Sequence, residues 1–414
     1  MVSKTVLDNG VSVISEEVSH VRSISVGIWV KCGSRHEDAI TNGTAHFVEH
    51  MLFKGTKSRS AFDIASAIDS VGGMMNAFTG KEITSFYITI PDYHLPLAIE
   101  LLADIFKNSR FDAVGIGREK SVVLQEIRML EDSPDEYIHD FFEATFWNNH
   151  PLGLPILGTE ERVKSFTRKS LVNFFRTRYG GGNVVLTAAG NLNHEALMRL
   201  ARKTFGTLMN GAFEEKQEAP KILPGVRVLK RDLEQAHLVI GVPAPSAASP
   251  QRHAGLLMNA VLGGSMSSRL FQEIRENRGL AYEIHSYLMP YSDTGMLGIY
   301  VGTGREKVRE VVRLIMKELK RMAGKRLTQK ELHAVKELTK GNLLLGMESM
   351  ESRMTRLARN EICYGRHITV EEVVERIDAI GANDIRSLAD ELFRPDTISL
   401  AAMGNVREED LAAS

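Results

Sequence analysis

Strand-like and helix-like patterns of hydrophobic residues follow one another in both halves of the chain. Residues 85–90 are rich in β-branched and aromatic side chains, and a helical pattern begins at about His94. Residues 296–301 and 306–321 show the same succession of strand and helix in the second half. These patterns predict the α+β class, with two α/β sandwich domains in which helices pack on one face of a mixed sheet.

Two segments that lie half a chain apart indicate an internal duplication. Residues 184–192 and 398–406 are both apolar runs that end in Gly-Asn and lead into a polar stretch. Their glycines, Gly190 and Gly404, are 214 residues apart, which is about half of the 414 residues. The two halves are therefore expected to share one architecture.

The duplication also predicts the domain boundaries. A polar stretch at 213–225, interrupted by Pro and Gly, is typical of a linker. We expect an N-terminal domain at 1–212 that carries the chemistry described below, and a similar C-terminal domain at 226–414 that lacks it. Two such halves would face each other and enclose a central cavity.

Composition and charge exclude several classes of function. The chain has 51 basic and 52 acidic residues and a formal net charge of −1, so we expect no nucleic-acid partner. Its two cysteines, Cys32 and Cys363, are far apart, which fits a reducing compartment. No apolar run approaches the ~20 residues that cross a bilayer. We therefore expect a cytoplasmic protein that does not insert into membranes.

The motif H-x-x-E-H at residues 46–50 carries the candidate chemistry. Residues 45–53 contain few helix breakers, and Thr44 is a reasonable N-cap. On a helix, His46 and His50 lie on one face and can bind one metal ion, while Glu49 can take a proton from water. The order is the reverse of the familiar metalloprotease motif. An amphipathic helix with two surface histidines is the alternative interpretation.

A distant acid strengthens the metal hypothesis. Glu126 follows His50 by 76 residues and interrupts an apolar helical segment, where burial of an unpaired carboxylate would be unfavourable. A metal ion would compensate that charge. Glu119 lies two turns earlier on nearly the same face and could support a ligating imidazole. An exposed charge is the alternative for Glu119.

These residues resemble a known family. Residues 46–56, followed at this distance by Glu126, are similar to the pitrilysin or insulinase-type (M16) zinc metallopeptidases, and to their mitochondrial-processing-peptidase-like branch in particular. The similarity extends over nearly the whole chain and includes residues 33–37, 72–79, 150–153 and 268–271.

The resemblance implies one Zn²⁺ per chain, bound by His46, His50 and Glu126. It implies that Glu49 is the general base and that Glu119 is a supporting acid.

The resemblance also implies residues that contact the substrate. Arg275 and Tyr282 resemble a pair that approaches the substrate from the second domain, although the residues by themselves favour a surface helix end and the start of a strand. The segment that contains Asn76, Ala77 and Phe78 resembles an edge strand that aligns the substrate backbone. Phe53, which follows the metal motif, is also expected to contact the substrate.

The sequence thus predicts a zinc-dependent endopeptidase, similar to a processing peptidase, that hydrolyses unfolded or extended peptides. The alternative is a non-catalytic scaffold or a substrate-presenting subunit of a larger complex. Peptides are the expected partners, and a homodimer is plausible.

Overall fold

The computed structural model describes residues 1–211 and 218–411 and divides them into two compact units. The first unit combines Met1–Met129, Gly346–His367 and the described part of Leu154–Gln217. The second unit combines Leu130–Gly153, Glu218–Leu345 and the described part of Ile368–Ser414. Each unit has its own sheet and core, which agrees with the expected α+β class and the duplication.

The first unit is built on a six-stranded sheet with the strand order β1-β2-β6-β3-β5-β4. Only β2 and β6 are parallel neighbours, and all other pairs are antiparallel. The strands are β1 (Val2–Val6), β2 (Ser12–Glu17), β3 (Ser23–Val30), β4 (Met74–Thr79), β5 (Thr84–Pro91) and β6 (Val184–Gly190). The helices are α1 (Thr44–Leu52), α2 (Ala61–Asp69), α3 (Leu95–Asn108), α4 (Ala113–Glu131), α6 (Glu160–Ser165), α7 (Arg168–Arg178), α8 (His194–Phe205) and α12 (Met350–Tyr364).

The second unit repeats this plan with a five-stranded sheet in the order β7-β11-β8-β10-β9. Again one pair, β7 and β11, is parallel and the rest are antiparallel. The strands are β7 (Gly225–Lys230), β8 (Gln235–Pro243), β9 (Ala281–Pro290), β10 (Gly295–Gly304) and β11 (Ser399–Gly404). The helices are α5 (Pro134–Phe146), α9 (Arg252–Leu262), a π-helix at Phe271–Glu276, α10 (Val308–Gly324), α11 (Gln329–Gly346), α13 (Val370–Ala379), α14 (Ala382–Leu392) and α15 (Glu408–Leu411).

The strand orders match the repeated sequence segments. β6 and β11 contain the two runs that end in Gly-Asn, and each stands between its parallel neighbour and an antiparallel strand. β5 and β10 contain the other repeated pair of strands, and each is second from one end of its sheet. The loose sequence repeat therefore reflects two sheets with the same connectivity.

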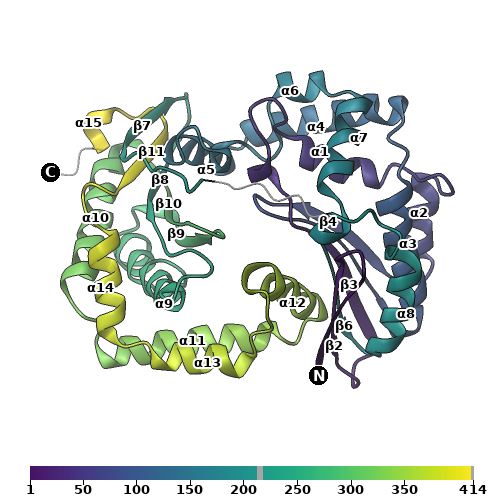
Figure 1. Cartoon of the computed structure of the whole chain (residues 1–414). Helices are drawn as coiled ribbons and strands as arrows, with labels where there is room; N and C mark the ends of the chain where they lie inside the picture. Colours follow the sequence, from purple (N-terminus) through teal and green to yellow (C-terminus); the bar gives the residue numbers. More distant parts are fainter. Residues whose placement is uncertain (212–217, 412–414) are drawn as a thin grey trace. The chain divides into compact units, whose positions relative to one another are not determined.

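The compact units differ from the linear division expected at residues 213–225, part of which lies outside the described residues. The exchanged helices are α5, which belongs to the second unit, and α12, which belongs to the first (Figure 1). Phe142 of α5 contacts the sheet where Gly241 has no side chain, since a Cβ atom there would be 2.4 Å from the Phe142 ring. Met354 of α12 similarly packs over Gly27 of β3, at 3.0 Å from a Cβ at that position.

This exchange gives each sheet two covered faces. In the first unit, helices α1, α3 and α8 pack with the larger core on one face, while α12 packs on the other face around Trp29. In the second unit, α9, α10 and α14 pack on one face and α5 covers the other. As expected, several helices pack on one face of each sheet. In addition, one exchanged helix, α12 or α5, covers the opposite face.

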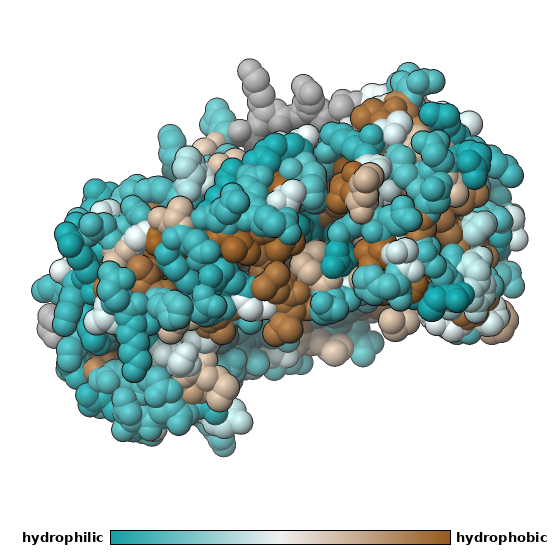
Figure 2. Space-filling model, turned by 90° about the horizontal axis from the view of Figure 1, so that it is seen from below, coloured by the Kyte–Doolittle hydropathy of each residue, from teal (hydrophilic) through white to brown (hydrophobic). Residues whose placement is uncertain are grey.

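Across the described ranges, no helix is long and apolar enough to cross a bilayer. On the face seen in Figure 2, hydrophilic residues cover most of the surface and hydrophobic residues form separate patches.

Candidate metal centre

Helix α1 carries the H-x-x-E-H motif, and a buried acid fixes where this helix begins. The sequence pattern predicted Thr44 as the N-cap, but Thr44 is the first residue of the helix. The N-cap is Gly43, which adopts the left-handed conformation with φ 86°. The Glu37 carboxylate accepts hydrogen bonds from the backbone N–H groups of Gly43 (2.8 Å) and Ala45 (2.5 Å). Glu37 therefore supplies the acceptors that an N-cap side chain would otherwise provide.

The structure brings His46, His50 and Glu126 together. One ligand atom from each of the three residues lies within 4.8 Å of the others. Nε2 of His46 is 3.9 Å, and Nε2 of His50 is 3.6 Å, from Oε2 of Glu126. α1 provides the two imidazoles from one face, and α4 provides the carboxylate from a distant part of the sequence.

The spacing of these atoms fits a metal better than direct hydrogen bonds. Hydrogen bonds between nitrogen and oxygen are about 2.7–3.2 Å long, so both separations are too large. Four tetrahedral zinc ligands at about 2.0–2.1 Å from the ion would be roughly 3.3–3.5 Å apart. Oε2 of Glu126 is buried and has no hydrogen-bond partner among the described residues, so a cation would compensate an otherwise unfavourable charge. The donor set of two imidazoles and one carboxylate is one that zinc enzymes use.

The protonation state of His46 also favours metal binding. Burial, with a smaller effect of the neighbouring His50, lowers the pKa of His46 to about 3. His46 is therefore neutral at physiological pH, which is the form that binds a metal. The rings of His46 and His50 are 4.6 Å apart between centroids, so both present their nitrogens to the same space.

Glu49 lies beside the three ligand atoms and is held by the edge strand. Its Oε2 accepts a hydrogen bond from the Thr79 hydroxyl at 2.5 Å. Burial raises the pKa of Glu49, and the charge of Glu126 adds to this effect, while the Thr79 hydrogen bond lowers the pKa. A carboxylate with a raised pKa is a stronger base than an exposed one, which suits proton transfer near neutral pH.

Glu119, the expected supporting acid, lies next to His50. Its side chain is buried, and its Oε2 is 3.1 Å from Nδ1 of His50. Its other oxygen forms an ion pair of 2.9 Å with Nζ of Lys54. Glu119 therefore accepts the Nδ1 proton of His50 and leaves Nε2 free to face Glu126. The alternative of an exposed charge does not fit this environment.

Removal of the Glu119 charge is expected to weaken zinc binding without abolishing it. Glu119→Gln keeps the shape but removes the anion that orients His50, so zinc affinity should fall about 10–100-fold. Competition with a chromophoric chelator would measure the affinity. Glu131→Gln, at the exposed end of the same helix, is the matched control and should bind zinc as the unmodified chain does. Equal affinities in both variants would contradict a supporting role for Glu119.

The predicted substrate strand is β4, which lies at the edge of the first sheet. It pairs only with β5 in the described part of the chain. Asn76 and Phe78 are exposed, whereas Ala77 faces the core between them. The Ala77 N–H donates to the Asn76 side chain at 2.8 Å, so this N–H lies on the free edge. Phe53 packs against the core, with its ring 6.1 Å from that of Phe86, and is less accessible than expected for a substrate contact.

Arg275 and Tyr282 lie in the second unit and contact each other. The Arg275 guanidinium is 5.1 Å from the centre of the Tyr282 ring and 4.8 Å from that of Phe271. Arg275 belongs to the π-helix, and Tyr282 is 81% exposed at the start of β9. The sequence predicted the pair, and the structure shows that the two side chains stack.

Three residues that position the site were not assigned by the sequence. Glu37 and Thr79 lie within segments that resembled the family, but neither had a role, and Lys54 stands four residues after His50. Their partners are far away in the sequence or on the backbone, so no local pattern identifies them.

Comparisons with known proteins identify the family of this chain. Residues 12–160 match the family model described as Insulinase (Peptidase family M16), and residues 165–339 match the Peptidase M16 inactive domain. The uncharacterized zinc protease YmxG of Bacillus subtilis is 40% identical over 396 residues, which cover 96% of this chain and 97% of the relative. An uncharacterized zinc protease of Mycobacterium leprae is 40% identical over 401 residues, which cover 95% of this chain and 89% of the relative.

Solved structures show the same fold. A protease from Helicobacter pylori matches with a TM-score of 0.90 at 23% identity, over 98% of this chain and 99% of the other. A peptidase M16 inactive domain from Pseudomonas fluorescens matches with a TM-score of 0.92 at 20% identity, over 98% of each chain.

The fold and the site thus define an M16-type peptidase architecture. The chain belongs to the insulinase-type M16 peptidase family, in which its relatives are named zinc proteases.

Proposed function

We propose that this chain is a zinc-dependent endopeptidase that hydrolyses internal bonds of unfolded or extended peptides, as a processing peptidase does. The observation that carries the proposal is the convergence of His46, His50 and Glu126, together with a Glu49 carboxylate that lies close enough to interact with the charges of His50 and Glu126. Three ligands leave one position of a tetrahedral zinc ion open, which distinguishes a catalytic from a structural site.

A zinc ion bound by these ligands would polarise the scissile carbonyl and lower the pKa of a water molecule at the open position. Glu49 takes the proton of the attacking water and transfers it to the leaving amine. Thr79 holds the Glu49 carboxylate in one orientation through its 2.5 Å hydrogen bond. Since Thr79 ends β4, the same strand orients the base and presents its free edge.

The free edge of β4 supports an extended substrate. A peptide that adds to this edge as a further strand would form main-chain hydrogen bonds with little sequence selectivity. The Ala77 N–H is already directed outwards, and a substrate carbonyl could replace the Asn76 side chain as its acceptor. Phe78, exposed on the face opposite Ala77, would contact substrate side chains.

The second unit would contribute Arg275 and Tyr282 in this proposal. A guanidinium and a phenol are suitable donors to an oxygen that becomes negative during carbonyl attack. A π-helix interrupts regular geometry and often marks a functional site, and here it presents Arg275 against an 81% exposed Tyr282.

Metal removal tests the proposed function directly. The purified chain, with its zinc content measured, would be incubated with a mixed library of unstructured peptides. We expect internal cleavage that stops on treatment with 1,10-phenanthroline and returns with added zinc. Stoichiometric zinc without cleavage by the chain alone would favour a substrate-presenting subunit, and neither zinc nor cleavage would favour a scaffold.

A further inference from the structure

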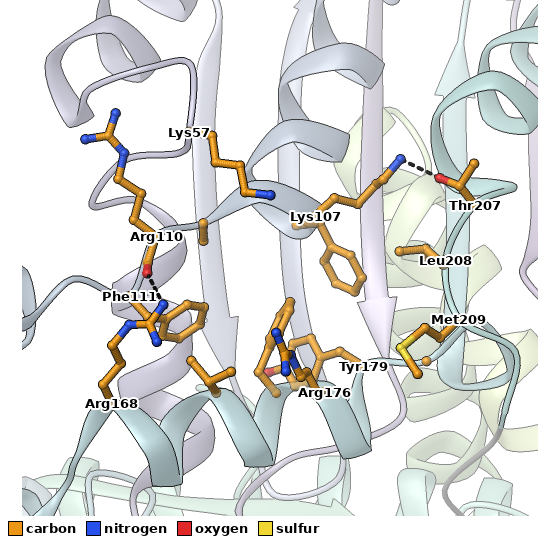
Figure 3. A pocket seen from close by; sticks show the side chains of 15 residues that line it. Lys57, Lys107, Arg110, Phe111, Arg168, Arg176, Tyr179, Thr207, Leu208 and Met209 are labelled. Atoms are coloured by element: carbon orange, nitrogen blue, oxygen red, sulfur yellow. Dashed lines mark hydrogen bonds between the residues drawn. The ribbon is translucent and has the colours of Figure 1, made fainter.

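The first unit contains a second concave site that shares no residue with the metal centre. An open pocket of about 500 Å³ lies between the end of α3, helix α7, and the segments around Lys57, Phe111 and Leu208 (Figure 3). Its volume is within the range of about 300–1,000 Å³ that is usual for small-molecule sites.

Packed aromatic rings form the apolar wall of this pocket. The Phe175 ring lies 5.8 Å from Phe106, 5.5 Å from Phe111 and 4.7 Å from Tyr179, measured between centroids. Phe106, Phe111 and Tyr179 are buried, so the cluster is anchored in the core. The wall therefore offers a rigid surface to a flat or apolar group.

Phe111 adopts a backbone conformation that is unfavourable for its type. Its φ is 49°, in the left-handed region that bulky residues rarely occupy. Such strain persists only where surrounding packing enforces it, and it is frequent at binding sites. The structure thus maintains the shape of the wall at a local energetic cost.

The rim of the pocket is strongly basic. None of the 15 lining residues is acidic. Five of them are cationic: Lys57, Lys107, Arg110, Arg168 and Arg176. None of the five forms an ion pair with a carboxylate in the described part of the chain. A chain with a net charge of −1 therefore concentrates about five positive charges around one hollow.

The hydrogen bonds of these cations leave donors for a ligand. Lys107 donates to Thr204 and Thr207, and Arg168 donates to the Arg110 carbonyl at 3.4 Å (Figure 3). The side chains of Lys57 and Arg176 have no hydrogen bond within the described ranges. Unpaired donors around one pocket favour an anion with several oxygens.

We propose that this pocket binds a small organic phosphate, with the phosphate held by the cationic rim and an aromatic or apolar group placed on the rings. Guanidinium groups match phosphate oxygens in geometry and charge, and a dianion balances several cations better than one carboxylate does. The gathering of the five cations around one pocket distinguishes this site from a nucleic-acid surface, which would require a basic stripe.

The test uses 1-naphthyl phosphate as the probe, with inorganic phosphate and 1-naphthol as its two halves. Isothermal titration calorimetry of the zinc-loaded chain should show one saturable site for 1-naphthyl phosphate. The affinity for 1-naphthyl phosphate should exceed the affinities for inorganic phosphate and for 1-naphthol at least tenfold, and it should fall at high salt. No saturable binding, or equal affinity for inorganic phosphate, would overturn the proposal.

A matched pair of double variants locates the binding site. Arg168→Gln with Arg176→Gln removes two rim charges from exposed positions of α7, and should weaken 1-naphthyl phosphate binding at least tenfold. Arg199→Gln with Lys203→Gln removes two exposed charges from α8 outside the pocket, and should change the affinity less than twofold. Circular dichroism verifies that both variants fold. Undiminished binding in the α7 variant would place the ligand elsewhere, including at the zinc, and would refute the pocket.

Discussion

Glu49→Gln is expected to reduce peptide cleavage by about 10²–10⁴-fold while zinc remains stoichiometric, because general-base catalysis typically contributes that factor. Gln retains the size of Glu49 and can still accept the Thr79 hydrogen bond, so the local structure should persist. What it cannot do is accept the water proton. The decisive measurements are kcat/KM with a fluorogenic peptide and the zinc content of the same sample.

The control for this variant is an acid of the same type outside the site. Glu161→Gln replaces an 85% exposed carboxylate on α6 and should leave both quantities unchanged. If Glu49→Gln cleaved peptides at the unmodified rate, Glu49 would have no part in proton transfer. If it lost zinc together with activity, the residue would belong to metal binding instead.

The local part of the metal site could be predicted from the sequence, because helical periodicity alone places His46 and His50 on one face. The third ligand is different in kind. Glu126 comes from another helix, and only the family resemblance, supported by its apolar surroundings, selected it among the acids of the chain. Glu37, which fixes the start of α1, could not be recognised, since its role depends on backbone groups whose position only the fold determines.

The exchanged helices show the same limit at the level of the fold. The apolar positions of α5, such as Ile138 and Phe142, predict that the helix buries one face. They do not specify which sheet it covers, because any apolar sheet face would satisfy the pattern. Which sheet the helix covers depends on how its side chains fit that sheet, such as the Phe142 ring over Gly241, which has no side chain. A division of the chain at one linker therefore describes its duplication but not its compact units.

Glu126→Gln is expected to lower zinc affinity by more than about 100-fold, since residues that merely support a ligand already contribute 10–100-fold. The substitution replaces the only anionic ligand among the three and leaves the imidazoles of His46 and His50. Activity should disappear with the metal and return only at high zinc concentrations. Zinc content after dialysis, measured by atomic emission, reads out the effect.

The three acids around the centre should thus give three different results. The Glu126 variant loses zinc and activity together and recovers activity only at high zinc concentrations, the Glu119 variant binds zinc about 10–100-fold more weakly and recovers activity with a moderate excess of zinc, and the Glu49 variant retains zinc but not activity. This separation follows from geometry: Glu126 faces both Nε2 atoms, Glu119 faces the far side of His50, and Glu49 is held by Thr79. Stoichiometric zinc in the Glu126 variant would show that this carboxylate is not a ligand, and the hydrolase assignment would fail with it.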